Sequence, residues 1–101
     1  MASWRHESAF RQECILSLIL TPLAFVLAKD IMQVVLMVSV LAIVLITELL
    51  NSAVDSVVDR VSDEFNELAG RAKDQGSAAV FVSLALVVLV WGAIIVDNYL
   101  L

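Results

Sequence analysis

The sequence has little of what soluble proteins of its length usually contain. Only 17% of its 101 residues are charged, and it has three glycines, one proline, one histidine and one cysteine. A single cysteine excludes an intramolecular disulfide, and one histidine and one cysteine in the whole sequence are too few for a zinc site. The net charge of −5 argues against nucleic acid as a partner, because phosphate backbones are bound by clustered Lys and Arg.

Long apolar blocks take the place of these residue types. Hydrophobic residues make up 61% of the chain and gather in runs over 14–28, 31–47 and 77–96. A soluble domain this small would expose more polar surface, and runs of this length indicate lipid as the solvent. The first run reaches only about 22 Å at about 1.5 Å per residue. We therefore expect its helix to extend back through Ala9 and to be kinked at Pro22.

These runs predict a single all-α membrane domain over residues 1–101. An amphipathic surface helix is expected over 2–13, followed by membrane spans over 14–28, 31–50 and 77–97, with the second helix continuing to about residue 60. Only Lys29 and Asp30 separate the first two runs, which predicts a tight helical hairpin.

The basic residues predict how the chain crosses the membrane. Five of them lie before the first span or between the second and third: Arg5, Arg11, Arg60, Arg71 and Lys73. Lys29 alone lies on the other side. Because excess Lys and Arg mark the cytoplasmic face, we expect the N-terminus and the segment between the last two spans in the cytoplasm. Trp4 and Trp91 lie near the expected interfaces, and we predict interface positions for both indoles.

The segment ELLNSAVDSVVD, residues 48–59, carries the most informative pattern. At about 100° per residue, its polar side chains fall on one narrow stripe of a helix: Glu48, Asn51, Ser52, Asp55 and Asp59. Solvation beyond the lipid is an equally good explanation for Asp59 and also applies to Asp55. It fails for Glu48, which directly follows a long apolar run, because acids there are costly and usually functional or paired.

Several acids on one stripe require a compensating cation, either a metal ion or a basic side chain. Clustered carboxylates suit Mg²⁺, which is typically held by one or two carboxylates together with substrate phosphates. Lys73 is a candidate phosphate ligand, with a membrane-interface anchor as the competing interpretation. Glu7 and Arg11 are four residues apart and share a helix face. Gly70 and Gly76 lack the spacing of a Walker loop, and no protein-kinase motif set is present, so a nucleotide site here would be of another kind.

Three segments resemble the bacterial integral-membrane diacylglycerol kinases. They are ESAFRQE (7–13), ELLNSAVDSVVDR (48–60) and ELAGRAKDQGSAAV (67–80). These motifs are long and gap-free, and with the hydropathy pattern the resemblance covers essentially the whole chain. Asp55 stands where the family usually has Glu, His6 stands where it usually has Asn, and the segment ahead of Trp4 is shorter than usual.

The resemblance implies a homotrimer of three-span protomers in the bacterial inner membrane, with composite active sites between protomers at the cytoplasmic surface. It also implies transfer of a phosphoryl group from ATP to diacylglycerol, with Mg²⁺ as cofactor, giving phosphatidic acid. By similarity, Glu48 is the general base, oriented by Asn51, and the lipid docks against the surface helix. Glu7 and Asp55 would hold the metal. The residues expected around the nucleotide are Lys73, Asp74, Asp59 and Arg11, and Glu13 falls in the same motif as Arg11.

Three other functions compete with this one. An undecaprenol kinase of the same architecture would phosphorylate a polyprenol, although GRAKDQGSAAV looks more like the diacylglycerol type. A small proton-coupled membrane transporter subunit would have four spans and an acid in mid-membrane, whereas the sequence predicts three spans and places Glu48 near the boundary. A holin-like or purely structural oligomer would leave the acidic stripe unexplained.

Overall fold

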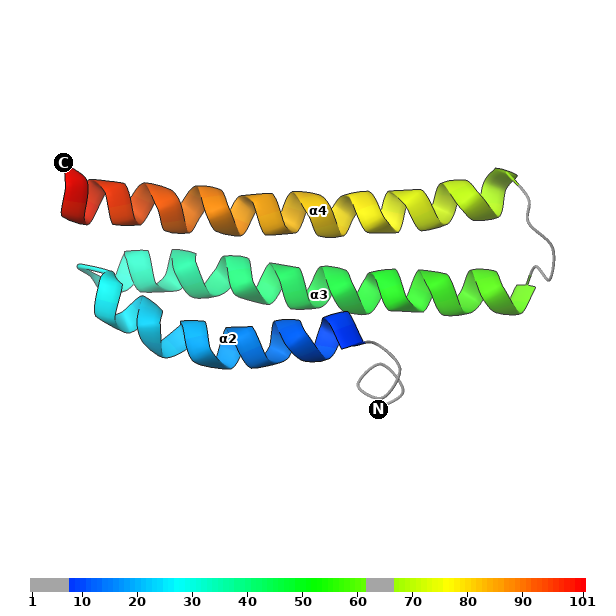
Figure 1. Ribbon diagram of the computed structural model, residues 1–101, viewed down its shortest axis with the longest axis horizontal. Helices are drawn as coiled ribbons and strands as arrows, with labels where there is room; N and C mark the ends of the chain where they lie inside the picture. The colour runs from blue at the N-terminus through cyan, green and yellow to red at the C-terminus, as the bar shows by residue number, and fades with distance from the viewer. Residues whose placement is uncertain (1–7, 62–66) are drawn as a thin grey trace.

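The structure, a computed structural model, describes residues 8–61 and 67–101, which form three long helices (Figure 1). The elements are α2 (Ser8–Leu27), α3 (Ile31–Val61), α4 (Glu67–Ile95) and a π-helical last turn, η1 (Val96–Leu100). α3 lies between α2 and α4 in the view of Figure 1. The all-α class predicted from the apolar runs is confirmed for the described part of the chain.

All three long helices are suited by length and composition to cross a membrane. Within the chain, 33% of the apolar segment of α3 is buried, against 11% for α2 and 17% for α4. α3 is therefore the central helix, against which the other two pack. Large apolar side chains such as Leu18, Val26 and Leu89 remain mostly exposed, the surface expected of helices that contact lipid or a neighbouring protomer.

α2 runs without interruption from Ser8 to Leu27 and includes Pro22. Proline removes one intrahelical donor, and the Thr21 hydroxyl donates to the Ser17 carbonyl oxygen at 2.7 Å in the turn before it. The helix extends back past Cys14, as its short apolar run led us to expect. The predicted surface helix begins among residues 1–7, which lie outside the described part, and its residues 8–13 belong to α2.

The turn between α2 and α3 consists of residues 28–30 and is held by local hydrogen bonds. The Gln33 backbone N–H donates to Asp30 Oδ1 at 2.9 Å, and the Lys29 N–H donates to Gln33 Oε1 at 2.9 Å. The first of these satisfies a donor in the opening turn of α3 that has no partner within the helix. The two helices therefore form a tight hairpin.

The core of the chain lies where α3 meets the two outer helices. Its buried cluster is Ala24, Met37, Val40, Leu41, Trp91 and Ile94. Trp91 is only 8% exposed, and its Nε1–H donates to the Met37 carbonyl oxygen at 3.1 Å. The prediction that the Trp91 indole faces the membrane as an anchor is therefore wrong, because a backbone carbonyl inside the bundle satisfies the indole N–H as well as the membrane interface would. Trp4 lies outside the described residues.

α3 and α4 run antiparallel, and contacts along their length define the register. From one end of the pair to the other, these contacts are Gln33–Asn98, Met37–Trp91 and Asp59–Lys73. Residue numbers rise along α3 as those of the partners fall. The same register puts Gly76 against Asn51 and so brings α4 onto the polar side of α3.

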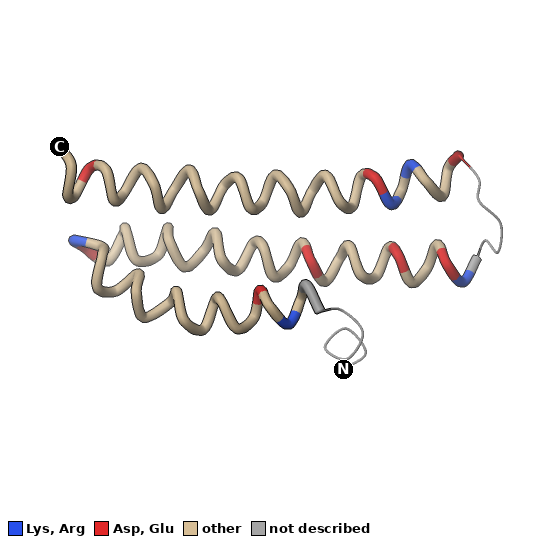
Figure 2. The backbone as a smooth tube through the Cα atoms, in the orientation of Figure 1, with Lys and Arg blue, Asp and Glu red and all other residues tan. Residues whose placement is uncertain are grey.

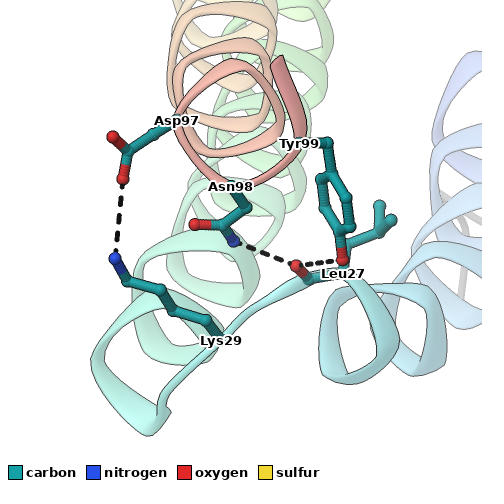
Figure 3. Close-up of a pocket in the computed structure, with 5 residues that line it drawn as sticks. All are labelled: Leu27, Lys29, Asp97, Asn98 and Tyr99. Carbon is teal, nitrogen blue, oxygen red and sulfur yellow. Dashed lines mark hydrogen bonds and ion pairs between the residues drawn. The ribbon is translucent and has the colours of Figure 1, made fainter. Parts of the chain in front are cut away.

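A group of hydrogen bonds ties η1 to the α2–α3 turn (Figure 3). We call it the C-terminal clasp, and it comprises Leu27, Lys29, Gln33, Asp97, Asn98 and Tyr99. Asn98 Nδ2–H and the Tyr99 hydroxyl both donate to the Leu27 carbonyl oxygen, at 3.1 and 2.9 Å. The Asn98 and Gln33 amides bond to each other at 2.8 and 3.3 Å, and Lys29 Nζ lies 3.7 Å from Asp97 Oδ2. The clasp thus satisfies a carbonyl at the end of α2 that has no helical partner.

Candidate active site

One face of α3 carries the predicted line of polar side chains, which we call the polar stripe: Glu48, Asn51, Ser52, Asp55 and Asp59. Figure 2 shows charged residues gathered over the ends of α3 and α4 that lead to their connection, separated by an uncharged stretch from a smaller group at the α2–α3 turn. Exposure increases along the stripe. Glu48 and Ser52 are each 7% exposed, Asn51 and Asp55 are half-buried, and Asp59 is exposed. The stripe therefore leads from the protein interior to the solvent.

Lys73 of α4 lies over the solvent end of the polar stripe. Its Nζ donates to Asp59 Oδ1 at 2.6 Å. This hydrogen bond raises the pKa of Lys73 above its ordinary value of 10.5, and the negative charges of Asp59 and Asp55 add to the effect, because all of them favour the ammonium form. Both side chains of the pair are substantially exposed, so it contributes little to stability. The structure thus brings Lys73 together with the stripe, which a membrane-interface anchor would not require.

Asn51 presses against the backbone of α4 at Gly76. A β-carbon at position 76 would collide with Asn51 Oδ1 and would lie 3.3 Å from Asn51 Cγ. Oδ1 is buried and has no hydrogen-bond partner among the described residues. Asn51 follows Glu48 by three residues, which is about one helical turn. The two side chains therefore make up the inner part of the polar stripe, together with Ser52.

Asp74 lies on a different face of α4 from Lys73. It lines a hollow of about 350 Å³ together with Glu67, Gly70 and Arg71. Consecutive helical residues point about 100° apart, so Lys73 can meet Asp59 while Asp74 points elsewhere. Arg71 Nη2 lies 3.3 Å from Glu67 Oε1, and a guanidinium in this hollow is a further candidate to contact phosphate. The sequence indicated Arg71 only as a topological marker, although its spacing of three residues from Asp74 is a signal that they share a face.

On α2, two residues of the first matched motif fall within the described part. Arg11 is exposed, and Glu13 is half-buried. Glu13 lines a cavity of about 220 Å³ bounded by all three long helices and is the one ionisable residue among those that line it. The other lining residues are Leu16, Ser17, Leu20, Leu41, Val44, Leu84, Val87 and Val88. Glu7, predicted as a metal ligand, lies outside the described residues.

The oxygen ligands of the polar stripe suit Mg²⁺ in kind. In residues 8–61 and 67–101, no three or more Asp, Glu, His or Cys side chains lie close enough together to hold an ion. Mg²⁺ commonly takes one or two carboxylates and completes its coordination with water and phosphate. The half-buried carboxylate of Asp55 therefore fits a ligand in a site that other groups complete.

Comparison with known proteins connects this arrangement to a family. The profile of the family described as prokaryotic diacylglycerol kinase matches residues 1–95. The chain belongs to the prokaryotic diacylglycerol kinase family. The matched range holds the whole polar stripe, Lys73 and the contact between Asn51 and Gly76, and it confirms the resemblance drawn from the three motifs.

Individual relatives within the prokaryotic diacylglycerol kinase family are similar over most of the chain. A protein named diacylglycerol kinase from Haemophilus influenzae is 51% identical over 94 residues, which cover 93% of this chain and 80% of the relative. One of the same name from Pseudomonas aeruginosa is 45% identical over 95 residues, with 94% and 77% covered. Another from Escherichia coli K12 is 42% identical over 90 residues, with 89% and 74% covered.

Proposed function

We propose that this chain is a diacylglycerol kinase that transfers the γ-phosphoryl group of ATP to the free hydroxyl of diacylglycerol, giving phosphatidic acid and ADP. The observation that carries the proposal is the polar stripe, with a buried acid, Glu48, at its inner end and the Lys73–Asp59 pair at its outer end. Such a stripe can meet a lipid hydroxyl at one end and a charged nucleotide at the other. The shared name of the relatives supports diacylglycerol as the acceptor.

Glu48 is the proposed general base. It directly follows the apolar part of α3, so a lipid whose acyl chains remain in the membrane can bring its hydroxyl to this side chain. Glu48 accepts the hydroxyl proton while the lipid oxygen bonds to the γ-phosphorus and the bond from that phosphorus to the ADP oxygen breaks. Asn51 orients Glu48. The lipid docks against the predicted surface helix, and the apolar cavity beside Glu13 offers room for an acyl chain.

The nucleotide is proposed to bind toward the solvent end of the polar stripe. Lys73 contacts the phosphates as a compact positive charge, and Asp59 holds its ammonium group in place through the 2.6 Å hydrogen bond. Asp74 of α4 and Arg11 of α2 are proposed to support the nucleotide as well. Phosphoryl transfer depends on such positioning and on charge neutralisation more than on covalent chemistry with the protein.

Asp55 and Glu7 are the proposed ligands of Mg²⁺, which when bound neutralises charge on the ATP phosphates. A single protomer offers few walls for a site of this kind, which supports the composite sites of a homotrimer. The exposed apolar surfaces of α2 and α4 are available for contacts between protomers and with lipid. We place the trimer in the bacterial inner membrane with its N-terminus in the cytoplasm, in keeping with the distribution of Lys and Arg.

The test is phosphorylation of dioleoylglycerol by the purified protein in mixed micelles containing ATP, with and without Mg²⁺. Glu48→Gln keeps the size of the side chain but cannot accept the proton, so we expect at least about a 100-fold loss of turnover with assembly unchanged. Thr47→Val is the matched control, because the Thr47 hydroxyl donates only within its own helix, to the Ile43 carbonyl oxygen at 2.6 Å.

Full turnover by Glu48→Gln would remove Glu48 from its role as the base. A wild-type protein that leaves diacylglycerol unchanged but phosphorylates undecaprenol would replace the proposed lipid substrate. A folded oligomer that phosphorylates neither lipid would sink the kinase proposal for this chain.

A further inference from the structure

Gly76 has a role that deepens the proposed function. We infer that Gly76 is a positioning residue: because it carries no side chain, it lets the α4 backbone approach Asn51 and hold the Asn51 amide beside Glu48. The inference rests on the proposed function, in which Asn51 orients the general base. Gly76 touches no substrate in this account and acts only through Asn51.

The close approach involves the functional end of the Asn51 side chain. A β-carbon on residue 76 would collide with Oδ1 and would lie 3.3 Å from Cγ and 3.8 Å from Cα of Asn51. The Asn51 amide would therefore move away more readily than the backbone of α3. Because the amide of Asn turns over a broad range about its last side-chain bond, it can rotate away from an added β-carbon while α3 stays in place.

Packing takes the place of a hydrogen bond at the Asn51 amide oxygen. Oδ1 is buried and has no hydrogen-bond partner among the described residues. The orientation of an amide usually follows from the hydrogen bonds that it makes, so at Oδ1 the α4 backbone supplies the constraint instead. Such a constraint works only while α4 remains close, and the helix spacing at Gly76 therefore sets where the amide lies.

Contacts on either side of Gly76 join the same two helices. The Lys73–Asp59 hydrogen bond lies one turn away on α4, and the Trp91–Met37 hydrogen bond holds the same two helices together further along. The close approach at Gly76 thus serves both ends of the polar stripe. It seats the Asn51 amide and brings α4 near enough for Lys73 to reach Asp59.

Gly92 of the same helix provides a matched control. A β-carbon there meets nothing within 4 Å in the described protomer. Since alanine forms helices better than glycine, Gly92→Ala should leave the melting temperature unchanged or raise it. Any loss in Gly76→Ala that Gly92→Ala lacks can then be assigned to the site of the substitution rather than to the loss of a helical glycine.

The experiment measures kcat per folded oligomer, KM for MgATP and the melting temperature for Gly76→Ala, Asn51→Ala, the double variant and Gly92→Ala in mixed micelles. We expect Gly76→Ala to lower kcat about 10- to 100-fold, because a misplacement of about 1 Å in an active site can cost up to about 100-fold, with KM for MgATP nearly unchanged. The double variant should have the same kcat and the same melting temperature as Asn51→Ala alone, because the amide that an alanine at position 76 would displace is already gone.

A wild-type kcat per folded oligomer in Gly76→Ala would overturn the inference, since a purely structural glycine lowers only the folded fraction. Additive losses in the double variant would overturn it too. If Gly76→Ala alone does not fold, the double variant decides: equality with Asn51→Ala supports the inference, and a further loss refutes it. Failure of the proposed function would look different, because neither the wild type nor Gly92→Ala would then turn over substrate.

In that case the melting temperatures decide. If Gly76→Ala shifts the melting temperature equally in the wild type and in Asn51→Ala, the role of Gly76 is refuted.

Discussion

Glu48, Asp55 and Asp59 carry the same chemical group on one face of one helix, yet they meet three environments. Glu48 is buried, Asp55 is half-buried, and Asp59 is exposed and bonded to Lys73. Burial disfavours a charged carboxylate, whereas solvent and nearby cations favour it. At the scale of single residues, depth along α3 therefore separates an inner acid suited to taking a proton from outer acids suited to holding cations.

Lys73→Ala should weaken the response to ATP. Removing the ammonium group is expected to raise KM for MgATP about tenfold, the value of one charge-assisted hydrogen bond, with a smaller effect on kcat. Because Asp59 raises the pKa of Lys73, the charge is present below the ordinary value of 10.5 and is lost only as pH rises through the higher folded value. The ratio of KM for MgATP in Lys73→Ala to KM in the wild type should therefore stay constant between about pH 7 and about pH 9.

Lys29→Ala is the control for this variant, because Lys29 is also an exposed lysine in an ion pair, but at the opposite end of the bundle. Its KM for MgATP should equal that of the wild type. An unchanged ATP dependence in Lys73→Ala would return Lys73 to the interpretation of a membrane-interface anchor.

Asp55→Asn should reduce activity chiefly by weakening metal binding. The substitution keeps an oxygen ligand but removes its charge, so we expect the Mg²⁺ concentration for half-maximal activity to rise by about tenfold or more. Activity measured against free Mg²⁺ tests this, with Asp97→Asn of the C-terminal clasp as the control. Should excess Mg²⁺ restore nothing and the apparent metal affinity stay the same, Asp55 has another role.

At the scale of elements, two different kinds of contact hold α4 and η1 to the rest of the protomer. The buried indole of Trp91 packs in the core and donates to Met37. The C-terminal clasp is polar and joins η1 to the end of α2 and the start of α3. A polar cluster can stabilise this end because each amide and hydroxyl in it has a partner, whereas a partly satisfied cluster would cost stability.

Asn98→Leu should destabilise the protomer without weakening ATP binding. The variant loses the hydrogen bonds to Leu27 and Gln33 and leaves the Gln33 amide with fewer partners, which we expect to cost about 1–3 kcal/mol. Thermal unfolding in micelles measures the loss, and Leu100→Ala, an exposed neighbour, is the control. A melting temperature equal to that of the wild type would show that the clasp does not hold this end.

The helices were predictable from the sequence, whereas their contacts were not. Lipid forces the backbone to satisfy its own hydrogen bonds, so long apolar runs indicate helices, and the spacing from Glu48 to Asp59 alone places these residues on one face. The contact of Asn51 with Gly76 and the burial of Trp91 depend on how α3 and α4 pair. No local pattern specifies that register, because the partners are far apart in the chain and lipid-facing and buried apolar residues look alike.

On the scale of the whole molecule, Figure 2 shows the charges of the described residues in two groups with an apolar middle stretch between them. The larger group spreads from the α3–α4 connection to about the middle of α3 and includes the start of α2, and the smaller one lies at the α2–α3 turn and the C-terminus. One end carries the polar stripe and Lys73, and the other carries the C-terminal clasp. The apolar middle remains mostly open to its surroundings rather than buried in the protomer. The described chain by itself therefore buries little of its apolar surface, and a membrane together with the neighbouring protomers of the proposed homotrimer would supply the remaining burial.

α4 is anchored firmly at one end by the C-terminal clasp and the buried Trp91, and more weakly at the other end by the exposed Lys73–Asp59 pair. Gly76 lies 22 residues from Asn98, which at about 1.5 Å per residue is an arm of roughly 33 Å. A tilt of only about 2° at the anchored end moves Gly76 by about 1 Å, enough to change a reaction rate by about two orders of magnitude. The thickness of a surrounding bilayer, which acts on the tilt of a membrane helix, would thereby reach the Asn51 amide of the proposed site.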